Sequence, residues 1–253
     1  MSGNVSRRKL ITTGLTAAAG VAGLGVAAKI ADHYGLIPPD WGGIWGPGET
    51  LTYATQRLLM ANGSLAREFN RSEVSKVVPV SGPRPKTDPY QRLLAGGFAD
   101  WRLTIGGLVA RPSTFSLDEI KRMPAKSQIT HQACEEGWSF IAEWTGVPLS
   151  YVLNLVGVSE KAKFVVFYPF DQSWDSLDLA DAYHAQTFLA YNLNGKDLPA
   201  DHGAPLRVRV ARQLGYKSVK YLHRLTLVDS LKNVGDGRGS ASPSYGYSWY
   251  AGI

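Results

Sequence analysis

The stretch Ile129-Thr130-His131-Gln132-Ala133-Cys134-Glu135-Glu136-Gly137-Trp138-Ser139 is the part of the chain that decides its fold. It holds the only cysteine among 253 residues, between a run of β-prone residues and a Glu-Glu-Gly turn. A side chain at the end of a strand can project into a pocket, so Cys134 is a candidate ligand. The alternative is a small buried thiol with a purely structural role, which is common for single cysteines.

The composition is that of an ordinary globular protein, with 44% hydrophobic and 19% charged residues. The formal net charge of +6 could favour an anionic ligand, nucleic acid or a membrane surface. Nucleic acid is not expected, because the basic residues are scattered and the one basic block is Arg7-Arg8-Lys9.

The single cysteine also limits the redox chemistry. It excludes an internal disulfide and an iron–sulfur cluster held by cysteines. The sequence has no C-x-x-C-H motif, so no covalently attached haem is expected. A redox reaction on this chain would therefore need electrons from a separate protein.

Residues 1–31 have the features of an export signal. The segment Ser6-Arg7-Arg8-Lys9-Leu10-Ile11 is a twin-arginine motif, and no charged residue occurs from Leu10 to Ala28. This run is rich in Ala, Gly and Thr, which favours a Tat signal, and Val26-Ala27-Ala28 is a candidate cleavage site. The alternative is an uncleaved N-terminal membrane anchor, because about 19 helical residues span roughly 28 Å. In both cases we expect the folded part in the periplasm.

The remaining chain is predicted to have an α+β fold. Residues 32–69 form a Gly/Pro/Trp-rich linker and a helix over Tyr53–Phe69, residues 70–230 the main domain, and residues 231–253 an aromatic tail that packs on it. Strands and short helices interleave irregularly without a repeat, which favours α+β over a doubly wound sheet. We expect strands at 100–105, 128–134, 163–168, 187–191, 206–210 and 218–228, and short helices at 116–123, 149–156 and 177–184.

Two further segments have the composition of a phosphate-binding site. They are His202-Gly203-Ala204-Pro205-Leu206-Arg207 and Gly215-Tyr216-Lys217-Ser218-Val219-Lys220. Small residues let the backbone approach a ligand, a turn presents N–H groups, and Arg and Lys add positive charge. On composition alone the alternative is a turn histidine, a paired surface arginine and a hairpin glycine.

Together these motifs resemble the sulfite oxidase family of molybdopterin-dependent oxidoreductases, over roughly residues 70 to 230. The Cys-x-Glu-Gly-Trp run, followed by Trp144-Thr145-Gly146-Val147-Pro148-Leu149, looks most like the bacterial periplasmic branch that includes the methionine-sulfoxide reductase catalytic subunit. The resemblance implies that the Cys134 thiolate is the catalytic molybdenum ligand. It implies further cofactor contacts, with His202 against the pterin, and with the phosphate held by Arg207 and by the loop Gly215, Tyr216, Lys217 and Ser218.

The sequence departs from the family at three places. Val77 to Gly82 does not match the first cofactor-contact segment, and Pro169 stands where the reductase branch has a polar contact. Sulfite oxidases carry arginines shortly after the cysteine, where this chain has Gly137, Trp138 and Ser139. Sulfite is therefore a poorer substrate candidate than a less charged one. The loop Phe170 to Asp175 is either the substrate mouth or a solvated connection.

From the resemblance we expect an exported molybdenum–molybdopterin enzyme that performs oxygen-atom transfer on a small or protein-bound sulfur or nitrogen oxide. Its redox partner would be a membrane cytochrome b or a periplasmic cytochrome. The alternatives are sulfite oxidase proper, a binding module of the same fold that has lost the cofactor, and an exported α+β domain with a structural cysteine.

Overall fold

The computed structural model describes residues 29, 36–40, 46–59 and 64–253. The predicted Tat signal and its cleavage site lie outside the described residues. Within the described part of the chain, no helix has the length and apolar character needed to cross a membrane.

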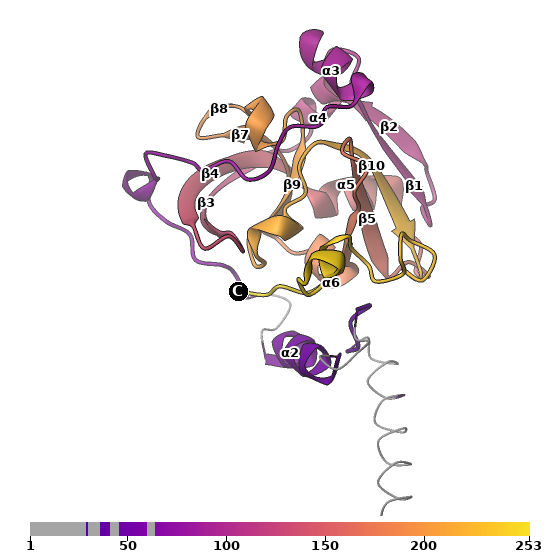
Figure 1. Ribbon diagram of the computed structural model, residues 1–253. Helices are drawn as coiled ribbons and strands as arrows, with labels where there is room; N and C mark the ends of the chain where they lie inside the picture. The colour runs from indigo at the N-terminus through magenta and orange to yellow at the C-terminus, as the bar shows by residue number, and fades with distance from the viewer. Residues whose placement is uncertain (1–28, 30–35, 41–45, 60–63) are drawn as a thin grey trace, which may run out of the picture.

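Two sheets form the body of the domain (Figure 1). One sheet has the order β2-β1-β10-β5-β6, and only its β1–β10 pairing is parallel. The other has the order β3-β4-β7-β8, and β9 also pairs with β7. Its five strands pair antiparallel. The first sheet consists of β1 (Arg102–Gly107), β2 (Ser113–Ser116), β5 (Phe164–Pro169), β6 (Asp175–Asp178) and β10 (Leu222–Val228). The second consists of β3 (Lys126–Ala133), β4 (Ser139–Pro148), β7 (Thr187–Leu193), β8 (Lys196–Asp197) and β9 (Arg207–Val210).

Short helices connect the strands, which confirms the predicted α+β class. The α-helices of the described residues are α2 (Gly46–Leu59), α3 (Asp88–Ala95), α4 (Leu117–Arg122), α5 (Leu149–Val156) and α6 (Leu179–Ala182). Four 3-10 turns are η1 (Arg71–Glu73), η2 (Ala200–His202), η3 (Gly215–Lys217) and η4 (Ser242–Tyr245). The turns η2, η3 and η4 carry or adjoin the residues of the candidate site.

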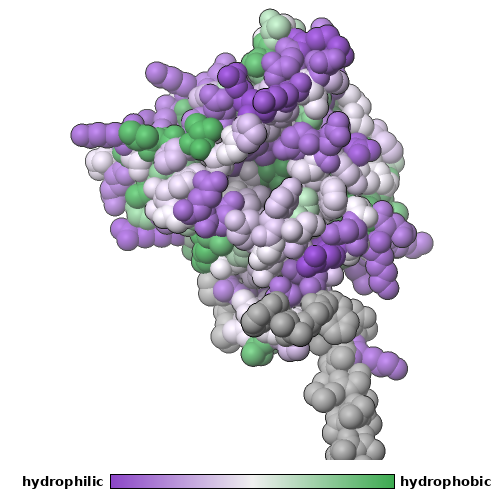
Figure 2. Space-filling view, viewed as in Figure 1, coloured by the Kyte–Doolittle hydropathy of each residue, from purple (hydrophilic) through white to green (hydrophobic). Residues whose placement is uncertain are grey.

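The main core joins residues from both sheets and from α5. Leu103, Val165, Val208 and Leu225 have no exposed surface, or almost none, in this core. The indole of Trp101 is also fully buried, and its Nε1 donates to the Leu222 carbonyl at 2.9 Å. Hydrophilic residues cover much of the face shown in Figure 2, where hydrophobic residues form small separate groups. Burial of the apolar side chains between the sheets is the main source of stability for such a domain.

Several local predictions are confirmed. α5 spans the predicted residues, and α4 begins with the predicted capping box, in which Glu119 N donates to Ser116 Oγ at 3.2 Å and Ser116 N donates to the Glu119 carboxylate. The helix ends before Pro124, as expected from the clash between proline and a preceding helical residue.

Two helix predictions were wrong in their limits. The predicted helix over Tyr53–Phe69 instead runs from Gly46 to Leu59, because Pro47 is well tolerated in a first helical turn. Phe69 is extended, and its N–H donates to Ile129 O of β3 at 2.9 Å. The first part of the predicted 177–184 helix belongs to β6, and Asp178 caps the short α6 by accepting from Asp181 N at 2.9 Å.

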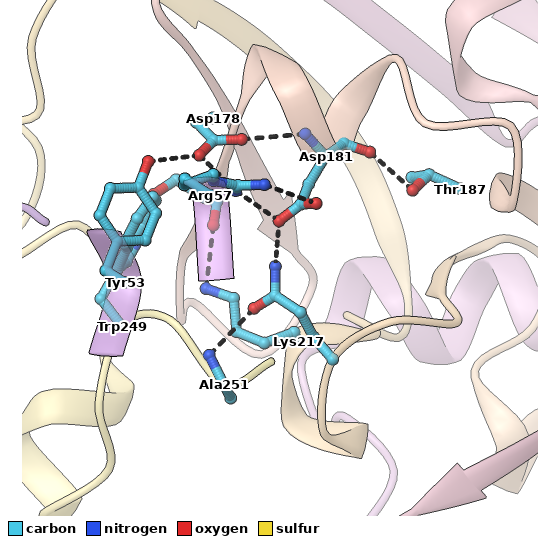
Figure 3. A network of polar contacts seen from close by, with 10 residues as sticks. Tyr53, Arg57, Asp178, Asp181, Thr187, Lys217, Trp249 and Ala251 are labelled. Carbon is cyan, nitrogen blue, oxygen red and sulfur yellow. Dashed lines mark hydrogen bonds and ion pairs between the residues drawn. The ribbon is translucent and has the colours of Figure 1, made fainter. Parts of the chain in front are cut away.

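A buried ion-pair network attaches α2 to the domain (Figure 3). Arg57 pairs with Asp178 and, at 2.7 Å, with Asp181. Tyr53 Oη donates to Asp178 at 2.6 Å, and its ring contacts the ring of Trp249 at a centroid distance of 5.8 Å. The C-terminal tail therefore packs between α2 and the domain.

Candidate cofactor-binding site

Cys134 follows directly on β3, at the strand end where the sequence placed it. Its N–H donates to Trp138 O at 2.9 Å, and Gly137 N donates to Cys134 O at 3.1 Å, so a tight turn joins β3 to β4. Gly137 has a φ of 91°, which favours glycine at that position. Cys134 is 7% exposed, and its Sγ lies 3.3 Å from the Glu135 carboxylate. Burial, together with this hydrogen bond, raises the pKa of the Cys134 thiol to about 11.

Gly215 packs against the backbone at Cys134. A Cβ added to Gly215 would stand 3.2 Å from Ala133 O, 3.3 Å from the Gln132 side-chain nitrogen and 3.6 Å from Cys134 Cα. Gly215 opens η3, in which Lys217 N and Ser218 N already donate to Leu214 O and Gly215 O. The N–H groups at the start of such a turn have no partner within it and can face a ligand.

A cavity of about 210 Å³ lies beside this contact. Arg207, Gly215, Tyr216 and Ser218 line it, so four of the seven predicted site residues share one space. Cys134 adjoins the cavity through Gly215, but it does not itself line it. The predicted cofactor residues from β9 and η3 thus meet at the end of β3.

A larger cavity, of about 420 Å³, lies between α2 and the tail. Its lining contains Asp40 and Glu49 and no basic side chain. None of the predicted residues reaches it. This acidic lining does not suit an anionic cofactor, so we place the site at the smaller cavity.

Arg207 is a buried cation without a carboxylate partner among the described residues. It is 4% exposed and donates to His202 O at 3.0 Å and to Ser218 O at 2.7 Å. Its Nε is buried and has no hydrogen-bond partner in the described part of the chain. Burial lowers the pKa of Arg207 to about 10. An anion in the cavity would compensate this charge, because a buried charge is costly unless it is paired.

His202 lies beside Arg207, outside the lining of the cavity. Its Nε2 is 3.2 Å from Val78 O, and its Nδ1 is buried without a partner among the described residues. The segment that contains Val78 could not be matched to the family by sequence. In the structure it reaches the site, since Ser81 also lines the cavity.

The two neighbouring lysines have different surroundings. The predicted Lys217 is buried, pairs with Asp175 and donates to Ser176 O at 2.9 Å, so its ammonium already has protein partners. The lysine that lines the cavity is Lys220, which donates to Ser81 O at 2.6 Å. Burial, and to a lesser extent the charge of Arg207, lowers the pKa of Lys220 to about 8. Lys220 is therefore a further candidate for the basic phosphate contact, and the role of Lys217 stays a prediction.

A second buried arginine was missed by the sequence reasoning. Arg209 has no exposed surface and donates to His131 O of β3 at 2.7 Å. Burial lowers the pKa of Arg209 to about 9. Both guanidinium groups lie near the ring of Trp144, at 5.0 Å for Arg207 and 5.7 Å for Arg209. The sequence offered little signal, since arginines that alternate with apolar residues are typical of a strand with one solvated face, whereas the structure buries the whole of β9.

The loop Phe170 to Asp175 also contributes to the site. Asp171, Ser173 and Trp174 line the cavity, next to Pro169 at the end of β5. The sequence left open whether this loop was a mouth or a solvated connection. Its position at the cavity favours the substrate mouth.

The side chains present here suit a metal ion whose other ligands come from an organic cofactor. In the described ranges, no three His, Cys, Asp or Glu side chains are grouped so that they could hold a metal ion. Cys134 offers one soft ligand, and the cavity beside it is lined by Arg207 and Lys220. Asp171 and Asp175 also line this cavity, and Asp175 is already paired with Lys217. A metal bound mainly by an anionic organic cofactor matches this arrangement.

Fold and site together define an oxidoreductase molybdopterin binding domain, and the chain belongs to this family, whose profile matches residues 91–233. Family membership confirms three predictions: the sulfite oxidase-type fold, the oxidoreductase class and the molybdenum–molybdopterin cofactor. The individual site residues remain predictions that the geometry supports.

The chain is similar to several known proteins. It is 38% identical over 154 residues to the putative protein-methionine-sulfoxide reductase subunit YedZ1 of Azospira oryzae, covering 61% of this chain and 56% of that protein. It is 34% identical over 162 residues to the protein-methionine-sulfoxide reductase catalytic subunit MsrP of Xanthomonas axonopodis pv. citri, covering 58% and 50%. The chain thus spans about half the length of the curated relatives it matches.

A solved structure of similar fold is the sulfane dehydrogenase SoxCD from Paracoccus pantotrophus. It aligns with a TM-score of 0.50 and 27% identity, over 52% of this chain and 39% of that chain. The aligned region supports the fold of the molybdopterin-binding part.

Proposed function

We propose that this protein is an exported molybdopterin oxidoreductase that reduces sulfoxides by oxygen-atom transfer. In this reaction the sulfoxide accepts two electrons and two protons, its S–O bond breaks, and a thioether and water result. The names of the two relatives, both protein-methionine-sulfoxide reductase subunits, favour a sulfoxide over a nitrogen oxide.

The residues of the site would bind and orient the cofactor. The molybdenum cofactor, when bound, supplies the two-electron oxygen-atom chemistry. Cys134 would provide a thiolate ligand, and Arg207 and Lys220 would pair with the anionic end. Gly215 lets η3 approach the end of β3, because a Cβ there would stand only 3.2 Å from Ala133 O and 3.3 Å from the Gln132 side-chain nitrogen, next to Cys134.

The observation that carries this proposal is the contact of Gly215 with Cys134 at the edge of a cavity that Arg207 and Lys220 line. It supports a role for Cys134 as a soft metal ligand, because the cavity beyond Gly215 holds the buried cation Arg207, which has no carboxylate partner among the described residues. A structural cysteine would not require this arrangement.

Sulfite oxidation is less well supported. Glu135 and Glu136 follow Cys134, and Glu136 accepts from Trp138 Nε1 at 2.7 Å. Carboxylates at this position would repel a sulfite dianion, whereas they would tolerate a neutral sulfoxide.

Export and the redox partner belong to the same proposal. The twin-arginine motif supports Tat export, and replacement of Arg7 and Arg8 by lysine should leave the protein in the cytoplasm on fractionation. The single cysteine and the lack of a haem motif support a separate electron donor, either a membrane cytochrome b or a periplasmic cytochrome.

An activity screen tests the proposed function. Protein from a host that makes the cofactor is assayed with methionine sulfoxide, dimethyl sulfoxide, trimethylamine N-oxide and sulfite, with reduced viologen as electron donor or ferricyanide as acceptor. We expect sulfoxide turnover that Cys134→Ser abolishes. Sulfite oxidation alone would favour the alternative, and no turnover in protein that contains molybdenum would sink the proposal.

A further inference from the structure

The larger cavity, of about 420 Å³ between α2 and the C-terminal tail, has a lining that the cofactor site does not use. Two carboxylates line it, from Asp40 before α2 and from Glu49 in the first turn of α2. Among the described residues, its lining contains no lysine, arginine, histidine, cysteine or methionine. The side chains that face this space therefore offer only oxygen ligands, and they suit a positively charged one.

Two consecutive residues of the tail hold the two carboxylates. Trp249 N donates to Asp40 Oδ2, and Ser248 Oγ donates to Glu49 Oε1 at 3.3 Å. The Cα atoms of consecutive residues lie about 3.8 Å apart. The two carboxylates therefore approach the same part of the tail, although one of them belongs to the segment before α2 and the other to the helix.

The negative charge at this point is not compensated. Asp40 is 4% exposed, and its Oδ1 is buried without a hydrogen-bond partner in the described part of the chain. Neither Asp40 nor Glu49 forms an ion pair with a described residue. Of the cations whose charge reaches Asp40, Lys217 is paired with Asp175, and Arg238 is exposed.

The surroundings of the two carboxylates disfavour their charged form. Burial raises the pKa of Asp40. Burial, and then the charge of Asp40, raises the pKa of Glu49. A buried charge is costly unless it is paired, so a cation in the cavity would stabilise both groups.

We propose that this cavity binds a calcium ion through Asp40 and Glu49, at a site separate from the cofactor site and independent of the proposed function. Calcium takes about six to eight oxygen ligands in variable geometry, whereas magnesium requires a near-ideal octahedron. The hydroxyl groups of Thr52 and Ser248 line the cavity, and backbone carbonyls and water can complete the shell. Zinc and copper are disfavoured, because they prefer histidine or cysteine.

The ion would join α2 to the tail. Its two carboxylates come from residues 40–49, and their hydrogen-bond donors come from residues 248–249, so the complete site exists only in the folded chain. A ligand that binds the folded state alone stabilises it in proportion to its concentration over Kd. Calcium should therefore raise the temperature of unfolding.

Metal binding by the full-length holoprotein tests the site directly, after treatment with a chelator and at constant ionic strength. Terbium takes the oxygen ligands of calcium, and its emission can be excited through the ring of Tyr250, which lines the cavity. We expect terbium emission that calcium chloride displaces, with a Kd for calcium on the order of 10⁻⁴ to 10⁻³ M, as in weak extracellular sites. Calcium at about ten times this Kd should raise Tm by about 3–6 °C.

The variants Asp40→Asn and Glu49→Gln remove one charge each and keep an oxygen that can accept from Trp249 N or Ser248 Oγ. Each should weaken calcium binding about tenfold or more, because few ligands carry the charge of the site. The matched control is Glu160→Gln, since Glu160 is exposed and does not line the cavity. It should bind calcium like the wild type.

Two results would overturn the inference. The first is a wild-type protein that shows neither terbium emission nor a calcium-dependent Tm, as expected if the two carboxylates share a proton instead. The second is an equal calcium affinity in the wild type and in either carboxylate variant, which would place the bound ion elsewhere on the chain.

Discussion

Gly215 and Cys134 lie so close together that a side chain on the glycine would meet the strand end, with its Cβ 3.6 Å from Cys134 Cα and 3.2 Å from Ala133 O. Two segments about 80 residues apart in sequence are thereby set in fixed positions relative to each other. Because Gly215 also lines the cavity, this contact positions the proposed metal ligand against the proposed phosphate loop.

Gly215→Ala should impair catalysis more than folding. The added methyl would stand 3.2 Å from Ala133 O and 3.3 Å from the Gln132 side-chain nitrogen, so η3 and the end of β3 must separate by a few tenths of an ångström. Small misplacements of reacting groups are costly. We expect about a tenfold loss of kcat/KM for a sulfoxide, on the order expected for such a displacement. The control is Gly106→Ala, because a Cβ at Gly106 in β1 meets nothing within 4 Å. Equal activity of the two variants would show that the close contact has no role in the site.

The two lysines after Gly215 should give different defects. Lys217→Ala leaves Asp175 buried without its cation, which should lower the free energy of unfolding by about 3–5 kcal/mol. Lys220→Ala should change the stability of the cofactor-free protein little, because its ammonium donates to backbone carbonyls, and should lower the molybdopterin content. Chemical denaturation and cofactor extraction measure the two effects. A full cofactor content in Lys220→Ala would show that another residue makes the phosphate contact.

Arg57 should hold α2 on the domain. Arg57→Ala leaves Asp178 and Asp181 buried without their cation, for an expected loss of about 3–5 kcal/mol in the free energy of unfolding. The matched control is Arg71→Ala, which removes the ion pair with Glu143 made by a side chain that is 75% exposed. That change should cost less than about 1 kcal/mol. Similar losses for both variants in urea denaturation would contradict the proposed strength of the buried network.

His184 should make the fold sensitive to acid. Its Nε2 lies 3.0 Å from Ser64 O and its Nδ1 accepts from Gln186 N, so the ring is held neutral. Burial, and then the charge of Arg212, lowers the pKa of His184 in the folded state, against the smaller opposing effect of Asp181. The unfolded chain therefore binds the proton first, and stability falls as the pH drops below about 6.5.

Urea denaturation at pH 7.5 and 5.5 measures this effect by comparing wild type with His184→Gln. The pKa values of His202 and His223 are also lowered, but both proteins keep those histidines. The variant should lose less stability than the wild type between the two pH values. An identical loss would mean that His184 does not contribute.

Much of the fold could be predicted from local sequence signals. The capping box at Ser116 and the helix Leu149–Val156 follow from short-range chemistry, and both were confirmed. The helix limits at Gly46 and Leu179 were missed. Pro47 in the first turn accounts for the start at Gly46. Pairing with distant segments removes Phe69 and Leu177 from the predicted helices, because Phe69 joins β3 and Leu177 joins β5.

The candidate site could be predicted in part. Motif order indicated Cys134, Arg207 and the η3 loop, whereas burial could not be read from the sequence. The sequence does not show that the Lys217 side chain is buried against Asp175, whereas the Lys220 side chain lines the cavity. Asp175 lies 42 residues away from Lys217 in sequence. Ser81 was missed because its segment has no regular structure and no motif.

X-ray absorption at the molybdenum edge tests the central claim, that the Cys134 thiolate binds molybdenum, most directly. The measurement counts the sulfur neighbours of the metal in wild-type protein and in Cys134→Ser, both from a host that makes the cofactor. We predict about one molybdenum per chain in the wild type, and one sulfur neighbour fewer, or no bound metal, in the variant. An unchanged sulfur count, or a wild-type protein without molybdenum, would contradict the account.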